Sequence, residues 1–213
     1  MANNRGRPSG PSTARSQLIE AAKQLFTALH YDKVSTRMVA EKAGVNAAMI
    51  RYYFSNKQGL FRTMLEETMA PMLEAMTQAR IGDDFESQVN VLRTYYRVMG
   101  QNPDFPKLIY RILTLEQDSP LFLMFMERVQ QVIGSSDSML FDALERKGEL
   151  KPGVEAAIAR VSFFSLMIFP FLAPPQMLAL HGAKLDPDFL DRLAEHNVAM
   201  LKAGMLANTG EHK

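Results

Sequence analysis

An all-α fold is the prediction from this sequence, and three observations support it. Apolar residues recur at intervals of three and four along most of the chain, the spacing that aligns them on one helical face. Stretches that alternate apolar and polar residues, typical of half-buried strands, are scarce. No segment repeats at a fixed period. We expect about nine helices, with three in a small N-terminal domain and the others in a larger C-terminal domain.

Local signals predict the N-terminal elements. Residues 1–12 are rich in Gly, Pro, Ser and Asn without periodicity, which is typical of a flexible basic arm. Four helices separated by short turns are expected to follow, over residues 13 to about 30, 36–43, 47–54 and 57–79.

Polar residues and a glycine mark the ends of the two short helices. Ser35 or Thr36 can cap the first helix, and Asn46 can cap the second. Gly44 stands where the first helix must end in a left-handed turn, because glycine adopts positive φ without strain.

The second half of the chain also has helical periodicity, broken at segments that contain Pro or Gly. The expected helices cover residues 85–100, 104–116, 120–146, 154–173 and 187–206. The most apolar run, at 161–175, is too short to span a bilayer and contains Pro170. We expect a buried helix there and no membrane partner.

The composition excludes several kinds of site and indicates a compartment. The chain has no cysteine, so disulfides, thiolate nucleophiles and cysteine-based metal sites are impossible. This composition fits the reducing cytoplasm, where we expect the protein to act. The first residues also lack the apolar stretch of a secretory signal.

Charge is distributed unevenly, although the net charge is only +1. Residues 1–62 hold ten Lys or Arg against three Asp or Glu, a net charge of +7. The remainder holds 14 basic against 20 acidic residues, a net charge of −6. A basic segment joined to an acidic one indicates that only the first meets a polyanion, and the alternative is chance clustering on solvated faces.

Two short helices joined by a glycine turn match the helix-turn-helix pattern, in which the second helix enters the DNA major groove. Ile50 and Phe54 of that helix are expected to face the core. Arg51 can then bond a guanine edge or a phosphate, and Tyr52 can contact a thymine methyl, a base or a phosphate. The expected DNA contacts of this region are Thr36, Arg37, Asn46, Ala47, Ala48, Arg51, Tyr52, Tyr53 and Lys57.

Three of these contacts have simpler alternatives. Tyr53 and Lys57 lie toward the rim, where a hydroxyl and an ammonium group suit phosphate oxygens. Either Tyr52 or Tyr53 could instead fill a small core, and Lys57 could be an ordinary solvated charge.

The stretch TRMVAEKAGVNAAMIRYYFSNKQGLF at 36–61 resembles the DNA-binding signature of the tetracycline-repressor (TetR) family of bacterial regulators. The similarity covers about residues 13–62. That family is all-α and dimeric, with three N-terminal helices for DNA and a larger C-terminal domain for ligand and dimer contacts. The resemblance therefore implies a DNA-binding domain at 13–58 and a ligand-binding and dimerisation domain at 59–213.

The resemblance also assigns roles to single residues. It implies phosphate contacts from Tyr53 and Lys57, and groove contacts from Ala47, Ala48 and Tyr52. Two positions depart from the family pattern and leave the operator sequence undetermined: Arg51, where many members have tyrosine, and Asn46, where serine or threonine is commonest.

The arm carries one more candidate DNA contact. RGRP at 5–8 resembles the core of the AT-hook, so Arg5 and Arg7 are expected to enter an A·T-rich minor groove. The alternative is a disordered basic tail that helps binding only weakly.

Methionine and phenylalanine crowd the second half of the chain. Such residues usually form a core, but together they also line adaptable apolar pockets. By the resemblance, a pocket for a small effector is expected among the helices over 85–173. Its candidate residues are Arg93, Tyr96, Arg97, Tyr110, Arg111, Phe125, Phe163 and Met167, with Tyr95 and Gln117 as further polar candidates.

The last two long helices are expected to form the dimer interface, because their apolar stripes are wider than one buried face needs. Two such helices from each subunit would make a symmetric four-helix interface. The candidate residues are Phe164, Phe171, Leu190, Leu193, Leu201 and Met205. The alternative is a last helix that is fully buried within one chain.

No arrangement typical of an enzyme is present: the four histidines are scattered, and there is no glycine-rich phosphate loop. We expect no metal and no cofactor. The leading hypothesis is a dimeric transcriptional regulator, most simply a repressor that a small, largely apolar effector releases from a palindromic operator. The alternatives are a ligand-independent regulator or an activator of the same fold, an architectural DNA-binding protein, and an all-α enzyme or lipid carrier.

Overall fold

The computed structural model describes residues 11–80, 82–102, 105–133 and 139–207, and within them it contains eleven α-helices and one short 3₁₀ helix. The all-α prediction is confirmed. The elements are α1 Pro11–Ala28, η1 Tyr31–Lys33, α2 Thr36–Ala43, α3 Ala48–Phe54, α4 Lys57–Ala79, α5 Phe85–Gln101, α6 Phe105–Leu113, α7 Pro120–Ile133, α8 Asp142–Arg146, α9 Ala156–Leu172, α10 Pro175–Leu180 and α11 Pro187–Met205.

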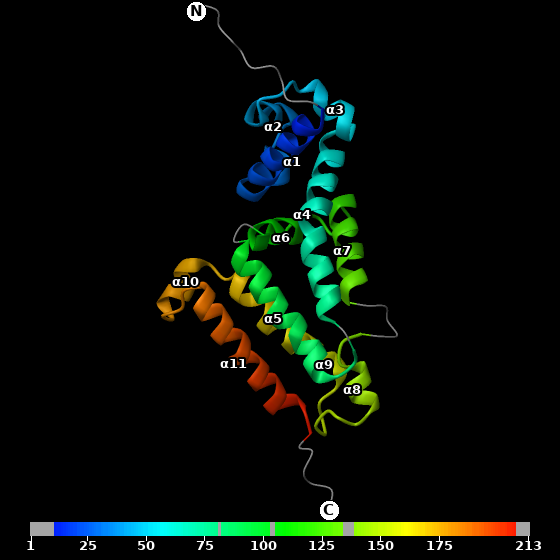
Figure 1. The fold of residues 1–213 in the computed structure, drawn as a ribbon, viewed down its shortest axis with the longest axis vertical. Helices are drawn as coiled ribbons and strands as arrows, with labels where there is room; N and C mark the ends of the chain where they lie inside the picture. Colours follow the sequence, from blue (N-terminus) through cyan, green and yellow to red (C-terminus); the bar gives the residue numbers. More distant parts are fainter. Residues whose placement is uncertain (1–10, 81, 103–104, 134–138, 208–213) are drawn as a thin grey trace, which may run out of the picture.

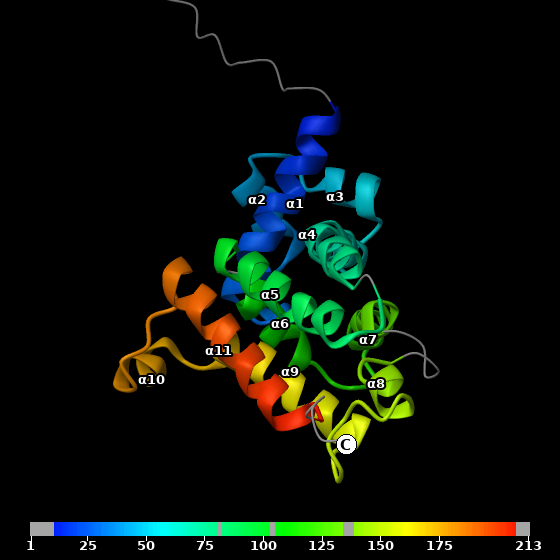
Figure 2. The ribbon, with the colours of Figure 1, turned by 60° about the horizontal axis from the view of Figure 1, so that its bottom comes forward.

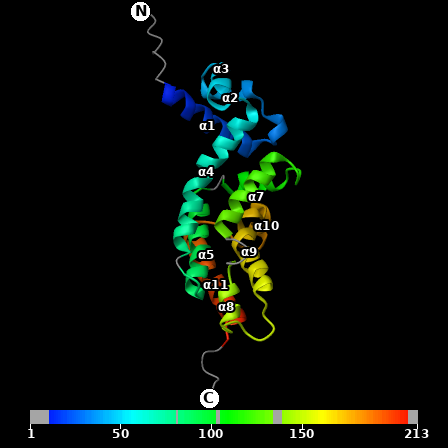
Figure 3. The same ribbon diagram turned by 90° about the vertical axis from the view of Figure 1, so that its right-hand side faces the viewer.

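The molecule is elongated, with α1, α2 and α3 at one end (Figure 1). From this end α4 runs into the other helices, where it lies against α5 (Figure 3). Two helices, α10 and α11, lie on one side of this larger group, and α7 and α8 lie on the other (Figure 2). No helix in the described part of the chain is long and apolar enough to cross a membrane.

One hydrophobic core connects the two groups of helices. At their junction, three aromatic rings from α1, η1 and α4 contact one another. The Phe26 ring meets the Phe61 ring edge to face at 4.7 Å and stacks on the Tyr31 ring at 5.6 Å. Aromatic pairs at these separations add to the stability gained from burial. This cluster fixes the N-terminal half of α4 against α1.

The predicted boundary signals of the short helices are present in the structure. The Ser35 hydroxyl accepts a hydrogen bond from the Met38 amide at 3.1 Å and caps α2. Gly44 ends this helix with φ of 67°, in the left-handed region. Asn46 Oδ1 accepts from the Ala48 amide at 2.8 Å, at the start of α3.

Two segments differ from the prediction, so that nine expected helices become eleven in the described residues. The helix expected over 120–146 is divided into α7 and α8. Phe141, just before α8, has φ of 71°, a left-handed conformation that cannot continue a helix. The second difference is α10, which lies in a segment expected to be a break. It begins at Pro175, and proline is well suited to the first helical turn because its φ is already helical.

The helix α9 is also more exposed than expected for the apolar run at 161–175. Phe163 and Met167 are buried, but Val161 and Phe169 are 68% and 54% exposed. The described residues therefore cover only one face of α9.

Candidate nucleic-acid interface and ligand cavities

The helices α2 and α3 pack against each other and against α1, and they leave one face of α3 uncovered. Ile50 and Phe54 are buried, as predicted, because they lie one turn apart on the core side. The opposite side of α3 presents Arg51 and Tyr52, and Ala47 and Ala48 are exposed at its N-terminal end. A helix with small residues at its start and long polar residues beside them has the shape that fits a DNA groove.

The two adjacent tyrosines lie in different environments. Tyr52 is 76% exposed, so it does not fill a core in this chain. Tyr53 is half-buried and packs against the core, and its ring meets the Tyr52 ring edge to face at 4.8 Å. Tyr53 therefore supports the ring of Tyr52. Because Tyr52 is itself exposed, its hydroxyl remains accessible to a ligand.

A tight turn connects α3 to α4, where a short turn was expected between residues 54 and 57, but the roles of Asn56 and Gly59 in it were not predicted. Ser55 has φ of 68°, and Asn56 Oδ1 accepts from the Gly59 amide at 2.9 Å. A Cβ atom on Gly59 would lie 2.0 Å from the Phe54 carbonyl oxygen, so only glycine fits there. The sequence contained one signal for this turn: Asn56 stands three residues before Gly59. An asparagine at that spacing can cap a helix, and a glycine allows another part of the backbone to approach closely.

The remaining candidate contacts surround α3. Lys57 is half-buried, with its Nζ 4.1 Å from the centroid of the Tyr31 ring, and desolvation lowers the pKa of its ammonium group. Thr36 is half-exposed at the start of α2. Arg37 is exposed and donates to Glu41 at 2.8 Å, a bond that raises the pKa of the guanidinium. Arg5 and Arg7 lie outside the described residues.

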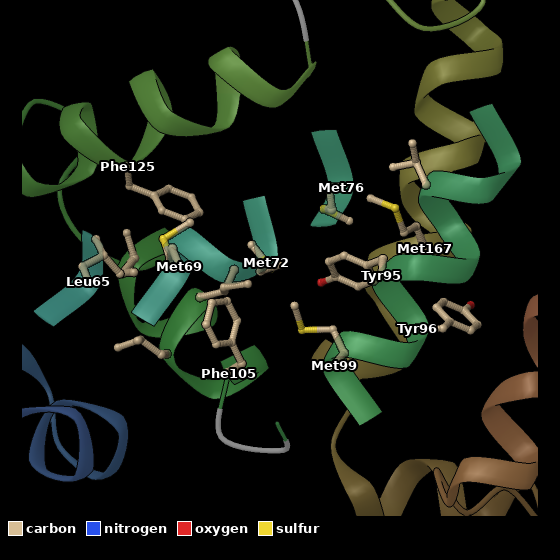
Figure 4. Close-up of a cluster of buried hydrophobic side chains, with 14 of the residues drawn as sticks. Leu65, Met69, Met72, Met76, Tyr95, Tyr96, Met99, Phe105, Phe125 and Met167 are labelled. Atoms are coloured by element: carbon tan, nitrogen blue, oxygen red, sulfur yellow. The ribbon is translucent and has the colours of Figure 1, made fainter. Parts of the chain in front are cut away.

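A first cavity, of about 270 Å³, lies among α4, α5, α6, α7 and α9. It contains two of the predicted ligand-binding residues, Phe125 and Met167, together with Tyr95 and with Phe164, which was predicted for the dimer interface. Figure 4 shows side chains from α4 and α5 converging in this part of the core. Almost all of its wall is apolar, as the crowding of Met and Phe predicts.

A second, wider cavity, of about 730 Å³, lies where α6 and the ends of α9 and α11 approach α1. The predicted residues Tyr110 and Arg111 line it, with Thr27 on the side of α1. The Thr27 hydroxyl is buried and has no hydrogen-bond partner among the described residues. Phe171 and Leu190, predicted for the dimer interface, also line this cavity.

The other predicted ligand-binding residues are separate from both cavities. Arg93 bridges α5 and α11, with its Nε 2.6 Å from Glu195 Oε1 and its Nη1 3.1 Å from Glu86 Oε2. The hydrogen bond to Arg93 lowers the pKa of the Glu195 carboxyl. Arg97 and Gln117 are exposed.

Two aromatic candidates are part of the core. The Tyr96 hydroxyl donates to the Leu166 carbonyl at 2.7 Å and accepts from Asn197 Nδ2 at 2.8 Å. Phe163 is fully buried, with its ring 5.5 Å from the Phe141 ring.

The candidate dimer residues of α11 lie mostly inside the chain. Leu190, Leu201 and Met205 are between 2% and 7% exposed on the face that meets α5, so they offer no surface to a second copy. Leu193 is half-exposed. Exposed apolar side chains that were not among the candidate dimer residues extend along α9 and α11: Ile158, Val161, Phe169 and Met200.

Comparison with known proteins agrees with the geometry of the N-terminal helices. The family model described as bacterial regulatory proteins, tetR family, matches residues 18–64, from α1 into α4. The uncharacterized HTH-type transcriptional regulator YvkB of Bacillus subtilis (strain 168) is 26% identical over 196 residues, which cover 90% of this chain and 97% of the relative.

Solved structures share the whole fold. The transcriptional regulator FadR from Bacillus subtilis, in complex with stearoyl-CoA, has a TM-score of 0.65 at 21% identity, over 89% of this chain and 98% of that one. NalD, the secondary repressor of the MexAB-OprM multidrug efflux pump in Pseudomonas aeruginosa, has a TM-score of 0.62 at 18% identity, over 93% and 100%. The described residues contain no group of three or more His, Cys, Asp or Glu that could hold a metal ion.

Proposed function

Because the chain is a TetR-family helix-turn-helix transcriptional regulator and not an enzyme, we propose that it is a dimeric repressor that releases a palindromic operator when a small, largely apolar effector binds. One observation carries the proposal. The helix α4 begins at the turn that holds α3, and its second half supplies Met69, Met72 and Met76 to the first cavity. A single helix thus connects the DNA face to a ligand site.

The DNA partner follows from the exposed face of α3. Arg51 and Tyr52 are proposed to contact bases, while Tyr53, Lys57 and the start of α2 contact phosphates. The net charge of +7 on residues 1–62 supports this partner, since phosphate neutralisation provides most of the non-specific affinity for DNA. If the DNA partner is the chromosome of a bacterium, the protein acts in the cytoplasm, and this is the proposed location.

A second copy of the chain is the proposed occupant of the exposed apolar faces of α9 and α11. Ile158, Val161 and Phe169 lie on α9, and Leu193 and Met200 lie on α11. Two helices from each subunit make the symmetric four-helix interface expected from the sequence. A symmetric dimer also presents two α3 helices, which must be spaced about 34–36 Å apart to enter successive major grooves.

Ligand control is proposed to act through α4. Its first half is tied to α1 by the ion pair of Arg15 with Glu67 and to α7 by Glu66 with Arg128. In some conformations of the dimer the spacing of the two α3 helices does not fit successive major grooves. An effector that binds such a conformation more tightly shifts the population toward it. Two neighbours of the same fold support this reading: NalD is a repressor, and FadR from Bacillus subtilis binds stearoyl-CoA.

Selection of bound fragments from random double-stranded DNA tests the proposal. We expect enrichment of one palindrome, with affinity that falls steeply with salt, and release in the presence of a metabolite extract. Weak preference among sequences would instead favour an architectural protein, and binding that the extract strengthens would favour an activator. A lack of salt-sensitive affinity for any duplex would refute the DNA-binding role.

A further inference from the structure

The first cavity, which we call the methionine cavity, has a size that restricts its occupant. Its volume is about 270 Å³, just below the roughly 300–1,000 Å³ of sites that hold drug-sized ligands. An engineered apolar cavity of about 150 Å³ holds one benzene molecule. The methionine cavity therefore suits a compact molecule of one or two rings better than a long acyl chain with its headgroup.

The wall of this cavity is apolar except at two side chains, Arg80 and Tyr95. Five methionines contribute to it, from α4, α7 and α9: Met69, Met72, Met76, Met126 and Met167. Thioether sulfur is polarizable and makes favourable contacts with aromatic rings, and methionine side chains adapt to the shape of a planar guest. The lining thus favours an aromatic occupant over a purely aliphatic one.

Tyr95 supplies a polar group to this wall. The residue is 5% exposed, and its hydroxyl forms no hydrogen bond with any described residue. By contrast, the hydroxyl of the adjacent Tyr96 has two partners, so the difference is specific to the position that faces the cavity. Figure 4 shows the Tyr95 ring extending from α5 toward the side chains of α4. Among the described residues only Thr27 has a fully buried side-chain polar atom without a partner, so the Tyr95 hydroxyl keeps some accessible surface, and this leaves it available to a ligand atom.

The charge state of this hydroxyl defines what it can bind. Burial raises the pKa of Tyr95 well above its ordinary value, so the group remains a neutral O–H donor at physiological pH. A phenolic hydroxyl can donate and accept, but it is the stronger donor, so an acceptor such as a carbonyl or ether oxygen is its favoured partner. A cation would lose its hydration against the surrounding methionines with only the guanidinium of Arg80 charged beside it, and an anion would have to compete for Arg80 with the interaction that this side chain already makes.

From these features we infer that the effector is a neutral aromatic molecule of one or two rings, with one hydrogen-bond acceptor that binds the Tyr95 hydroxyl inside the methionine cavity. This inference rests on the proposed function, because it names the ligand class of the same regulatory site. The matched probes are benzophenone, which has an acceptor, and diphenylmethane, which has the same two rings without it. Stearate serves as an anionic, long-chain probe.

Isothermal titration calorimetry of the full chain, without DNA, measures the three affinities. We expect benzophenone to bind roughly fivefold to tenfold more tightly than diphenylmethane, the worth of one hydrogen bond. The Tyr95→Phe variant should lose this preference and bind diphenylmethane as the unaltered chain does. Tyr110→Phe, which removes an exposed hydroxyl at the second cavity, is the matched control and should retain the preference.

A second variant keeps the test decisive if Tyr95→Phe does not fold. Val129→Phe, on α7, should fill part of the cavity and weaken both aromatic probes at least tenfold. Failure of both probes to bind, equal affinities, a preference that survives Tyr95→Phe, or tighter binding of stearate would each overturn the inference. Because no DNA is present, these outcomes are separate from failure of the proposed repressor function, which appears only in the DNA selection.

Discussion

The Arg111 guanidinium on α6 lies 2.9 Å from His30 Nε2, just beyond the end of α1, and donates a second hydrogen bond to the Ala28 carbonyl at 3.3 Å. Arginine can only donate, so the nitrogen of His30 that faces it must carry a lone pair. The bond to Ala28 satisfies one of the carbonyls that are left without partners at a helix C-terminus. This pair therefore joins the DNA-binding helices to the ligand-binding helices directly, in addition to α4.

Replacement of Arg111 by Met is expected to loosen this junction while it preserves much of the side chain's apolar volume. The end of α1 then loses its cap, so backbone amides of residues 29–34 should exchange hydrogen faster, by roughly threefold to tenfold. Hydrogen–deuterium exchange with mass spectrometry measures this. The matched control is Arg97→Met, an exposed arginine on α5, and equal acceleration in both variants would contradict the junction role.

Local signals in the sequence were sufficient for the framework of the DNA face. Ser35, Gly44 and Asn46 were predicted because a cap or a left-handed turn involves neighbours within four residues. The burial of Ile50 and Phe54 follows equally from helical periodicity. These effects are short-ranged, so the sequence alone contains the necessary information.

The ligand-binding helices were less predictable, because their side chains find partners far along the chain. Arg93 was a ligand-binding candidate, yet its guanidinium pairs with Glu195 on α11, 102 residues away. Tyr95 and Tyr96 are adjacent tyrosines with similar apolar neighbours in the sequence, but only the Tyr96 hydroxyl meets partners on α9 and α11. Which side chain faces a cavity depends on helix packing that periodicity does not determine.

Gly59→Ala is expected to destabilise the protein by about 1–3 kcal/mol or more and to abolish specific DNA binding. The added Cβ would lie 2.0 Å from the Phe54 carbonyl oxygen, and backbone cannot move aside without displacing α3. Chemical denaturation and operator binding measure the two effects. Gly204→Ala is the control, because a Cβ there meets nothing within 4 Å and helical alanine is favoured by up to about 1 kcal/mol. Similar stability losses in both variants would contradict the steric argument.

Lys57→Ala is expected to weaken binding about equally on all DNA sequences and to reduce the slope of log affinity against log salt by about one. The physical reason is the loss of one phosphate contact, which releases one fewer counterion. Electrophoretic mobility shifts over a salt series measure the slope, with Lys202→Ala, exposed near the end of α11, as control. Since Lys57 also contacts the Tyr31 ring, the melting temperature of the variant must be measured in parallel. An unchanged slope would contradict the phosphate contact and leave Lys57 only its contact with the Tyr31 ring.

Val161→Glu is expected to produce monomers that bind the operator at least tenfold more weakly. Val161 is 68% exposed on α9, and a carboxylate in an apolar four-helix interface loses its hydration without a counter-ion. Sedimentation velocity gives the oligomeric state. Leu123→Glu, at a 55% exposed position on α7, is the matched control and should remain dimeric. An intact dimer in the Val161 variant would place the interface elsewhere.

Tyr96→Phe is expected to lower the free energy of unfolding by about 1–3 kcal/mol, because it leaves the Asn197 amide and the Leu166 carbonyl without their shared partner. The same hydroxyl predicts an alkaline effect. Burial raises the pKa of Tyr96 to about 12, whereas an unfolded tyrosine titrates near 10. Between these values the folded state holds a proton that the unfolded state has lost, so stability falls as pH rises from about 10 to about 12.

In the Tyr96→Phe variant this alkaline component is absent, so the decrease in stability over that range should be smaller than in the unaltered chain. Tyr95, whose pKa burial also raises, still contributes, and some decrease therefore remains. Urea denaturation at a series of pH values, monitored by circular dichroism, separates the two effects. Tyr110→Phe provides the control, since it removes a tyrosine hydroxyl at a 52% exposed position on α6, outside this hydrogen-bonded link. If the profiles of all three proteins coincide, the Tyr96 hydroxyl does not titrate as a buried, hydrogen-bonded group, and the link that it makes between α5, α9 and α11 is weaker than its geometry indicates.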